Sequence, residues 1–305
     1  MRRLLLWAAQ NRWLAAHVPR WWFARRAVRR FLPGESFEAA LKAAVDFKSR
    51  NIGALFTVLG ENVTDLEDAN RVVQHYEEVL AATGGVQAEI SVKPTQLGLD
   101  IDAEAAYANL MRLARAARNA KSFMWIDMEG SDYTESTLQL YRFLRATHAN
   151  VGICLQAYLR RTRADLESLL PMGPAIRIVK GAYAEPDDKA FPDKREVDDN
   201  FHWIAEQLWK PEARANGAWA TLGTHDRTLI SELELLAKRM GVGAKDYEYA
   251  LLYGIQRGEQ LRLVKAGRNV RVLISYGAHW FPWYMRRLAE RPANLLFVAK
   301  SMFAS

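Results

Sequence analysis

The chain has 305 residues, of which 50% are hydrophobic and 25% are charged, so it has enough apolar surface for a full-sized core and is not globally disordered. Its one cysteine, Cys154, excludes a disulfide framework and a cysteine-rich metal site, and no apolar run reaches the roughly 18 residues of a membrane span. Residues 1–34 hold eight arginines and no acidic residue, whereas the rest of the chain is nearly neutral, which argues against a nucleic-acid partner.

The basic segment 1–34, called the arm below, also carries four tryptophans among leucines and alanines. They are Trp7, Trp13, Trp21 and Trp22. Arginine and tryptophan on short helices are typical of a peripheral contact with an anionic membrane surface. The same pattern equally fits helices that pack on the body of the protein and leave their arginines in solvent.

Prolines divide the arm. Pro19 is expected to separate two helices, and Pro33-Gly34 is expected to end the second one. The apolar stretch 4–9 is too short for a signal peptide, because polar residues interrupt it. We therefore expect a cytoplasmic protein, with the arm available for the inner membrane face.

From Glu35 onward, short apolar or β-branched runs alternate with stretches of helical periodicity. The expected strands are 53–59, 88–93, 123–128, 151–155, 176–179, 219–222, 247–251 and 270–274. The expected helices include 66–83, 103–120, 135–146, 163–170, 199–212, 227–240 and 259–266. Eight strands in this order predict an α/β fold, a (β/α)₈ TIM-like barrel over residues 35–305 with extra N-terminal helices in the arm. A doubly wound sheet would have nearer six strands.

Polar residues gather at the carboxyl ends of the expected strands. They are Lys93, Asp127, Glu129, Gln156, Lys180 (followed by Gly181), Thr224, His225 and Asp226. In a barrel these strand ends converge on one mouth, where barrel enzymes have their active sites. The alternative is that they are only the solvated beginnings of loops.

Residues 280–292 form the densest local pattern. Pro282 suits the first turn of a helix, on which Arg286 and Arg287 would point about 100° apart and could both bind one carboxylate. Taken alone, the spacing favours the alternative, because arginine pairs on such a helix are usually solvated.

Several common motifs are missing. The sequence has no G-x-G-x-x-G after a strand, no Walker loop, no H-E-x-x-H and no nucleophile elbow, and its six histidines are scattered. We expect no metal site, and a nucleotide cofactor would have to bind without a Rossmann fingerprint.

Seven segments occur in an order that identifies a family. They are Leu59-Gly60-Glu61, Ser91-Val92-Lys93-Pro94-Thr95-Gln96-Leu97-Gly98, Ile126-Asp127-Met128-Glu129, Leu155-Gln156-Ala157-Tyr158, Arg177-Ile178-Val179-Lys180-Gly181-Ala182-Tyr183, Thr224-His225-Asp226 and Arg286-Arg287-Leu288-Ala289-Glu290-Arg291-Pro292. In these segments the chain resembles the proline dehydrogenase family, and its basic N-terminal helices resemble those of monofunctional bacterial members. The resemblance implies a (β/α)₈ barrel that holds FAD non-covalently.

The resemblance also implies roles at the substrate. Arg286 and Arg287 would bind the substrate carboxylate, with Lys93 as a further cation and Glu61 pairing with Arg286 to hold the last helix closed. Asp127 would lie at the substrate, and the remaining contacts would be Tyr183, Leu252, Leu273 and Trp283.

For the flavin, the resemblance places Arg177 near the reactive edge, where it would stabilise the reduced, anionic form. The other residues that would hold FAD are Met128, Gln156, Val179, Lys180, Gly181, Ala182, Thr224, His225 and Glu290.

The chain departs from the family pattern at four positions. Leu273 and Trp283 stand where tyrosines are usual, Ala250 stands where glutamine is common, and Thr57 stands where aspartate is common. Leu273 would leave more space beside the substrate ring and make that wall less polar. Which cyclic imino acid is preferred therefore stays open.

The expected function is oxidation of L-proline to Δ1-pyrroline-5-carboxylate, with the electrons passed to a quinone. One alternative is the same chemistry on hydroxyproline or another cyclic imino acid. A second is a lyase with Lys93 as a Schiff base, and a third is a non-catalytic barrel on the membrane surface. From the residues alone, Lys93, Asp127 and His225 could equally be structural.

Overall fold

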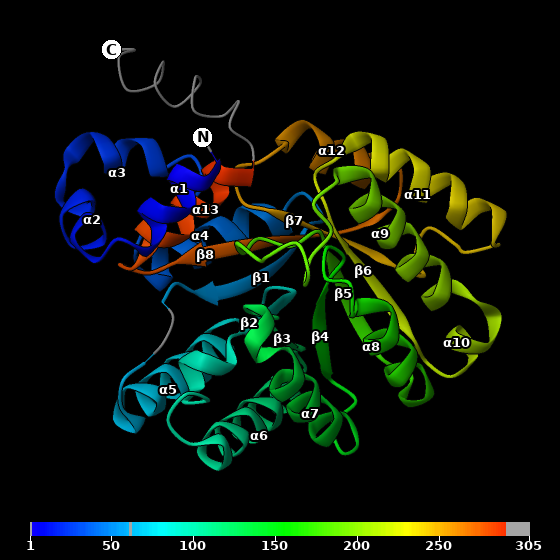
Figure 1. Cartoon of the computed structure of the whole chain (residues 1–305), viewed down its shortest axis with the longest axis horizontal. Coiled ribbons are helices and arrows are strands. Elements are labelled where there is room, and N and C mark those ends of the chain that lie inside the picture. Colours follow the sequence, from blue (N-terminus) through cyan, green and yellow to red (C-terminus); the bar gives the residue numbers. More distant parts are fainter. Residues whose placement is uncertain (1, 61–62, 291–305) are drawn as a thin grey trace.

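The computed structural model describes residues 2–60 and 63–290, and Figure 1 shows a closed barrel surrounded by helices. All eight strands are parallel and each is hydrogen-bonded to the next in chain order, with β8 closing on β1. The strands are β1 (Gly53–Val58), β2 (Ala88–Val92), β3 (Met124–Ile126), β4 (Val151–Gln156), β5 (Ala175–Val179), β6 (Trp219–Gly223), β7 (Glu248–Leu252) and β8 (Asn269–Tyr276). The predicted (β/α)₈ barrel is confirmed.

Successive side chains of each strand lie in two different environments, because they point alternately to opposite faces of the sheet. The larger environment lies between the sheet and the helices, and includes Ile90, Ile126 and Ile178. A small cluster formed by Leu55, Trp125 and Ala175, which come from three separate strands, fills the barrel interior.

The helices that follow the strands begin at predictable caps. Asp65, Asp102, Asp193 and Asp226 each accept a hydrogen bond from a backbone N–H in the first turn of the helix that follows. These outer helices are α5 (Leu66–Ala82), α6 (Ala103–Asn119), α7 (Thr134–Arg145), α8 (Thr162–Leu169), α9 (Lys194–Trp209), α10 (Pro211–Ala215), α11 (Arg227–Arg239), α12 (Arg257–Lys265) and α13 (Trp280–Glu290).

Two features of the helix prediction were wrong or incomplete. The helix expected over 199–212 begins five residues earlier, at Lys194, and a separate helix starts at Pro211 because a proline there cannot donate the hydrogen bond that would continue α9. Helix α4 (Phe37–Lys48) was not predicted; Ser36 caps it, and it packs on β1 and β8.

The arm forms three helices where two were expected: α1 (Arg2–Gln10), α2 (Arg12–His17) and α3 (Trp22–Val28). Asn11 causes the additional break, since its side chain accepts from the backbone N–H of Leu14 and starts a new helix. Pro19 does separate α2 from α3, but α3 ends at Val28, before Pro33 is reached.

The inner face of the arm packs on α13, and Figure 1 shows α1 beside that helix. The arm and α13 share one apolar cluster, whose buried members include Ala24, Ala27, Val28, Phe31, Leu32, Trp280, Phe281, Tyr284 and Leu288. Trp280 also donates from Nε1 to Glu35, 3.2 Å away. The division into an arm and a barrel domain stays a prediction. None of the helices in the described part of the chain combines the length and apolarity needed to cross a membrane.

Candidate active site

Three predicted residues meet near the mouth: Lys93 and Asp127, which directly follow β2 and β3, and Arg177, which lies within β5. Asp127 receives hydrogen bonds at Oδ1 from Arg177 Nη2 and from Ser91 Oγ, the latter at 2.6 Å. Arg177 Nη2 also donates to Ser91 Oγ at 2.9 Å. Lys93 Nζ lies 3.9 Å from the other oxygen of Asp127 and 3.5 Å from Thr57 Oγ1. One carboxylate is therefore held between two cations.

This group carries an excess of positive charge. Arg177 is buried, and burial alone would lower its pKa, but Cys154 and Asp127 raise that pKa overall, so the guanidinium stays charged. Lys93 is also largely buried. Two cations around one carboxylate leave an electrostatic environment that suits an anionic ligand.

Two of the predicted site residues have a buried polar atom without a hydrogen-bond partner within residues 2–60 and 63–290. These atoms are Nη1 of Arg177 and Oε1 of Gln156. The amide group of Gln156 is fixed, because its Nε2 donates to the carbonyl oxygens of Met128 and Glu129 at 2.9 and 2.7 Å. A buried donor and a buried acceptor held in this way indicate a ligand that carries complementary groups.

The turn after β5 requires glycine. Gly181 has φ +121°, and a Cβ atom there would lie 2.2 Å from Cδ1 of Tyr158. The backbone N–H groups of Ala157 and Tyr158 donate to the carbonyl oxygens of Val179 and Lys180. The loop after β4 and the turn at Lys180-Gly181-Ala182 therefore lie closely together.

Lys180 belongs to a network of two lysines and two aspartates. Its Nζ lies 2.5 Å from Asp198 and 2.9 Å from Asp226, and Lys194 contacts the same two carboxylates. Burial would raise the pKa of Asp226, but hydrogen bonds from Lys194 and Lys180 outweigh it and hold that pKa below its ordinary range. The network fixes Lys180 at the mouth.

The ends of β6 and β7 are joined through His225. Its Nε2 accepts from the backbone N–H of Leu252 at 2.8 Å, which implies that Nδ1 carries the proton in the neutral ring. Thr224 is buried, and its Oγ1 accepts from the N–H of Asp226 at 3.2 Å. Across the ladder Leu252 pairs with Leu273.

Helix α13 brings its arginines to this region. The Cζ atom of Arg286 lies 5.5 Å from the centroid of the Tyr183 ring, so the helix touches the loop that follows β5. Arg287 and Trp283 are half-buried on the same helix, and Trp283 packs with the apolar cluster of the arm. Glu61 and the side chain of Glu290 lie outside the described part of the chain, so the pairing of Glu61 with Arg286 stays a prediction.

Sequence reasoning missed Ser91, which joins Asp127 to Arg177. It lies two residues before Lys93 on one strand and therefore faces the same side, a signal that the period of two could have supplied. Glu129 was singled out as a strand-end residue, and its carboxylate accepts from the backbone and hydroxyl groups of Thr95. That contact is structural.

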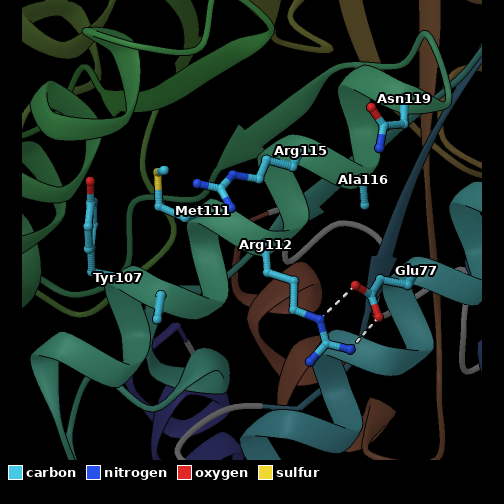
Figure 2. Close-up of a pocket in the computed structure, with 8 residues that line it drawn as sticks. Glu77, Tyr107, Met111, Arg112, Arg115, Ala116 and Asn119 are labelled. Carbon is cyan, nitrogen blue, oxygen red and sulfur yellow. Dashed lines mark hydrogen bonds and ion pairs between the residues drawn. The ribbon is translucent and has the colours of Figure 1, made fainter.

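A groove on the outside of the barrel, between α5 and α6, is separate from the mouth. Figure 2 shows Arg112 paired with both carboxylate oxygens of Glu77 at its edge, at 2.7 and 2.5 Å. The remaining lining comes from α6, with Tyr107, Met111 and Arg115 among the side chains drawn. No strand-end residue lines this groove, so it has no part in the chemistry at the mouth.

Comparison with known sequences identifies relatives of similar length. A family profile described as "Proline dehydrogenase" matches residues 40–300. Proline dehydrogenase 2 of Bacillus subtilis subsp. natto is 35% identical over 283 residues, which cover 92% of this chain and 91% of that protein. Proline dehydrogenase 1 of Bacillus subtilis strain 168 is 33% identical over 305 residues, 99% of each chain.

Solved structures show the same barrel. Proline utilization A (PutA) from Bdellovibrio bacteriovorus, inactivated by N-propargylglycine, matches 89% of this chain with a TM-score of 0.81 and 21% identity. PutA from Corynebacterium freiburgense matches 99% of it with a TM-score of 0.75 and 22% identity. This chain spans about a third of those two proteins, 33% and 34% of their lengths. From the family profile and the extent of the matches to full-length relatives, we conclude that the chain belongs to the proline dehydrogenase family.

Proposed function

We propose that this protein is an FAD-dependent dehydrogenase that oxidises L-proline to Δ1-pyrroline-5-carboxylate and passes the electrons to a quinone. The observation that carries the proposal is the cluster of Lys93, Asp127 and Arg177 on three β-α units, in a chain whose relatives are named proline dehydrogenases.

The substrate proposal follows from charge. Proline is small, and its one strong handle is its carboxylate, for which the bidentate guanidinium groups of Arg286 and Arg287 are suited. Lys93 adds a third cation near the same mouth. The contact of Arg286 with Tyr183 supports a closed arrangement in which α13 covers the substrate.

The same positive charge suits the chemistry. The ring amine of proline must be neutral before the adjacent carbon can lose hydride, and nearby cations lower the pKa of an amine. Arg177 and Lys93 would favour the neutral amine, while Asp127 holds Arg177 in place. The single negative charge of Asp127 thereby offsets part of the positive charge of Arg177 and Lys93, and a net positive charge remains.

The residues at the mouth fit FAD. The unpartnered Nη1 of Arg177 supplies a buried donor, and the unpartnered Oε1 of Gln156 supplies a buried acceptor. The turn at Lys180-Gly181-Ala182, together with Met128, Val179, Thr224, His225 and Glu290, would complete the binding site. When bound, FAD supplies the chemistry that this chain lacks, because it accepts a hydride from the substrate carbon.

Leu273 supports a second candidate substrate. It packs with Trp125 and Leu55, so the wall at the level of the Leu252–Leu273 pair is apolar. A substituted ring such as hydroxyproline is therefore the second candidate, and it would be oxidised by the same chemistry.

The arm supports a peripheral membrane contact. Trp7, Trp13 and Trp22 are 57%, 58% and 70% exposed, although the inner face of the arm is buried on α13. Exposed tryptophans beside arginines favour an anionic lipid surface, where a quinone would be accessible. Replacing Trp13 and Trp22 with serine should weaken binding to anionic vesicles and leave proline oxidation with a soluble acceptor unchanged.

Turnover of L-proline and trans-4-hydroxy-L-proline with an artificial electron acceptor, followed by mass spectrometry of the product, tests the function. The proposal predicts a product two hydrogens lighter than proline. A substrate adduct trapped on Lys93 by borohydride, in a protein that binds no flavin, would instead support the lyase. Flavin binding and vesicle binding without turnover of either substrate would support a non-catalytic barrel.

A further inference from the structure

Trp125 lies inside the barrel below the mouth and faces Arg177. The Cζ atom of Arg177 is 5.5 Å from the centroid of the Trp125 ring. Trp125 is 2% exposed and Arg177 is 5% exposed, so the contact is almost free of solvent. A cation over an indole face is stabilised most strongly under these conditions.

The indole ring is fixed from two directions. Its Nε1 donates to Glu89 Oε2 at 2.6 Å, and the Phe123 ring lies 5.0 Å away from it, centroid to centroid. Glu89 is itself held by Arg271 at 2.9 Å, and Arg271 also binds Glu248 at 2.9 Å. The acceptor for the indole is thus part of a buried charged network that joins β2, β8 and β7.

Gly152 on β4 leaves the space that the ring occupies. It pairs with Trp125 across the ladder, and a Cβ atom on it would lie 2.6 Å from Cζ3 of the indole. Strand β4 separates β3 from β5, and its Cys154 pairs with Arg177. Because Gly152 has no side chain, the indole can cross β4 and reach the guanidinium.

Arg177 is therefore held on two sides. Asp127 and Ser91 bind its Nη2, and Trp125 covers its face. The remaining Nη1 is buried without a hydrogen-bond partner among the described residues. This arrangement fixes the direction in which the free donor points.

We propose that Trp125, held by Glu89 and accommodated by Gly152, is a positioning residue that aims Arg177 at the flavin and thereby sets the affinity for FAD and its reduction potential. The inference rests on the proposed function, since it assumes that FAD is the group that Arg177 meets. It adds a layer of residues beneath the cluster of Lys93, Asp127 and Arg177.

The test compares Trp125→Leu, Trp125→Phe and Gly152→Ala with the matched control Trp219→Phe. Trp219 belongs to the same interior cluster, but its Nε1 donates to Thr221 and it shows no ring contact with Arg177. The measurements are the FAD dissociation constant, by titration of the apoprotein, and the midpoint potential of the bound flavin.

We expect Trp125→Leu and Gly152→Ala to raise the FAD dissociation constant by roughly threefold to thirtyfold, the size of a desolvated cation–π contact, and to make the potential more negative. Trp125→Phe keeps an aromatic face and should fall between Trp125→Leu and the wild type. The control should match the wild type. Unchanged affinity and potential in Trp125→Leu, or an equal change in Trp219→Phe, would overturn the proposal.

A measurement without flavin separates this proposal from the proposed function. If the wild type bound no FAD, the function would fail, but the holding of Arg177 could still be tested by hydrogen exchange of its Nε–H group, assigned by its loss in Arg177→Lys. Faster exchange in Trp125→Leu than in Trp219→Phe would support the positioning role. Equal exchange in the two variants would exclude it.

Discussion

Arg286 on helix α13 lies over the ring of Tyr183 in the loop after β5, with 5.5 Å between its Cζ atom and the ring centroid. About a hundred residues separate the two in the chain, so the contact exists only because the barrel closes β8 on β1 and returns α13 to the mouth. It places a permanent cation against the loop that follows β5.

Removing the ring should loosen Arg286. Tyr183→Ala is expected to raise KM for proline by roughly threefold to thirtyfold, because the half-buried cation–π contact with Arg286 is lost. Steady-state kinetics with a soluble acceptor measures this change. Tyr183→Phe keeps the ring and is the control; an equal rise in KM for both variants would assign the effect to the hydroxyl group.

Arg286→Ala and Arg287→Ala should each weaken substrate binding and leave the flavin spectrum intact. Loss of one charge-assisted hydrogen-bonding group costs about 1.5–3 kcal/mol, which raises KM by roughly 10- to 150-fold. Arg112→Ala, which breaks an ion pair on the outer groove, should change neither quantity. Loss of flavin from both variants on α13 would contradict the carboxylate assignment.

Leu273→Tyr should alter the preference between substrates. A tyrosine would narrow the apolar wall next to Leu252 and add a hydroxyl group, so the ratio of kcat/KM for proline to that for hydroxyproline should rise roughly tenfold. The same change at Leu261, a partly exposed residue of α12, is the control. An unchanged ratio would remove Leu273 from the specificity of the enzyme.

Gly181→Ala should destabilise the turn that follows β5. A Cβ atom would lie 2.2 Å from Tyr158 on a backbone with φ +121°, so Tyr158 or the turn must move. Gly217 is the matched control, because its φ is +92° and nothing lies within 4 Å of a Cβ atom there. We expect Gly181→Ala to cost about 1–3 kcal/mol more free energy of unfolding than Gly217→Ala and to weaken FAD binding. Equal midpoints of urea unfolding for Gly181→Ala and Gly217→Ala would show that Tyr158 moves away without a loss of stability.

Asp226 should contribute to acid sensitivity. Its pKa is lower in the folded chain than in the unfolded chain, so its stabilisation is present above the ordinary carboxyl pKa of about 4 and is lost as the pH falls below that value. Asp226→Asn should therefore lower the midpoint of urea unfolding at neutral pH. As the pH falls, this midpoint should decrease less in the variant than in the wild type. Asp46→Asn, which breaks an exposed pair with Arg50, is the control. If the urea midpoint of Asp226→Asn decreased as steeply with falling pH as that of the wild type, this role of Asp226 would be contradicted.

The barrel and part of the site could be predicted because both follow from local patterns. Alternating runs predicted all eight strands, and the convergence of parallel strand ends predicted that Lys93 and Asp127 lie close together. Arg177 was placed at the site by the family resemblance alone. The residues that lock Arg177 were not found in this way. Ser91 and Trp125 lie within strands and read as ordinary strand residues, and their partners are distant in the chain.

Glu89 shows why such a network is hidden in the sequence. Burial raises its pKa, and the groups that favour its charged form, Arg271, Trp125 and Arg177, lie 182, 36 and 88 positions later in the chain. The additional helix break at Asn11 was missed for a different reason, since a single capping side chain overrode an otherwise helical stretch.

An anaerobic absorbance titration of the purified protein with L-proline tests the central claim most directly. We expect visible flavin bands that bleach as proline is added, which would report the cofactor and the reaction in one experiment. Bands that persist with proline and bleach with hydroxyproline would move the substrate assignment to the second candidate. A protein that stays colourless after FAD is added would contradict the proposed function.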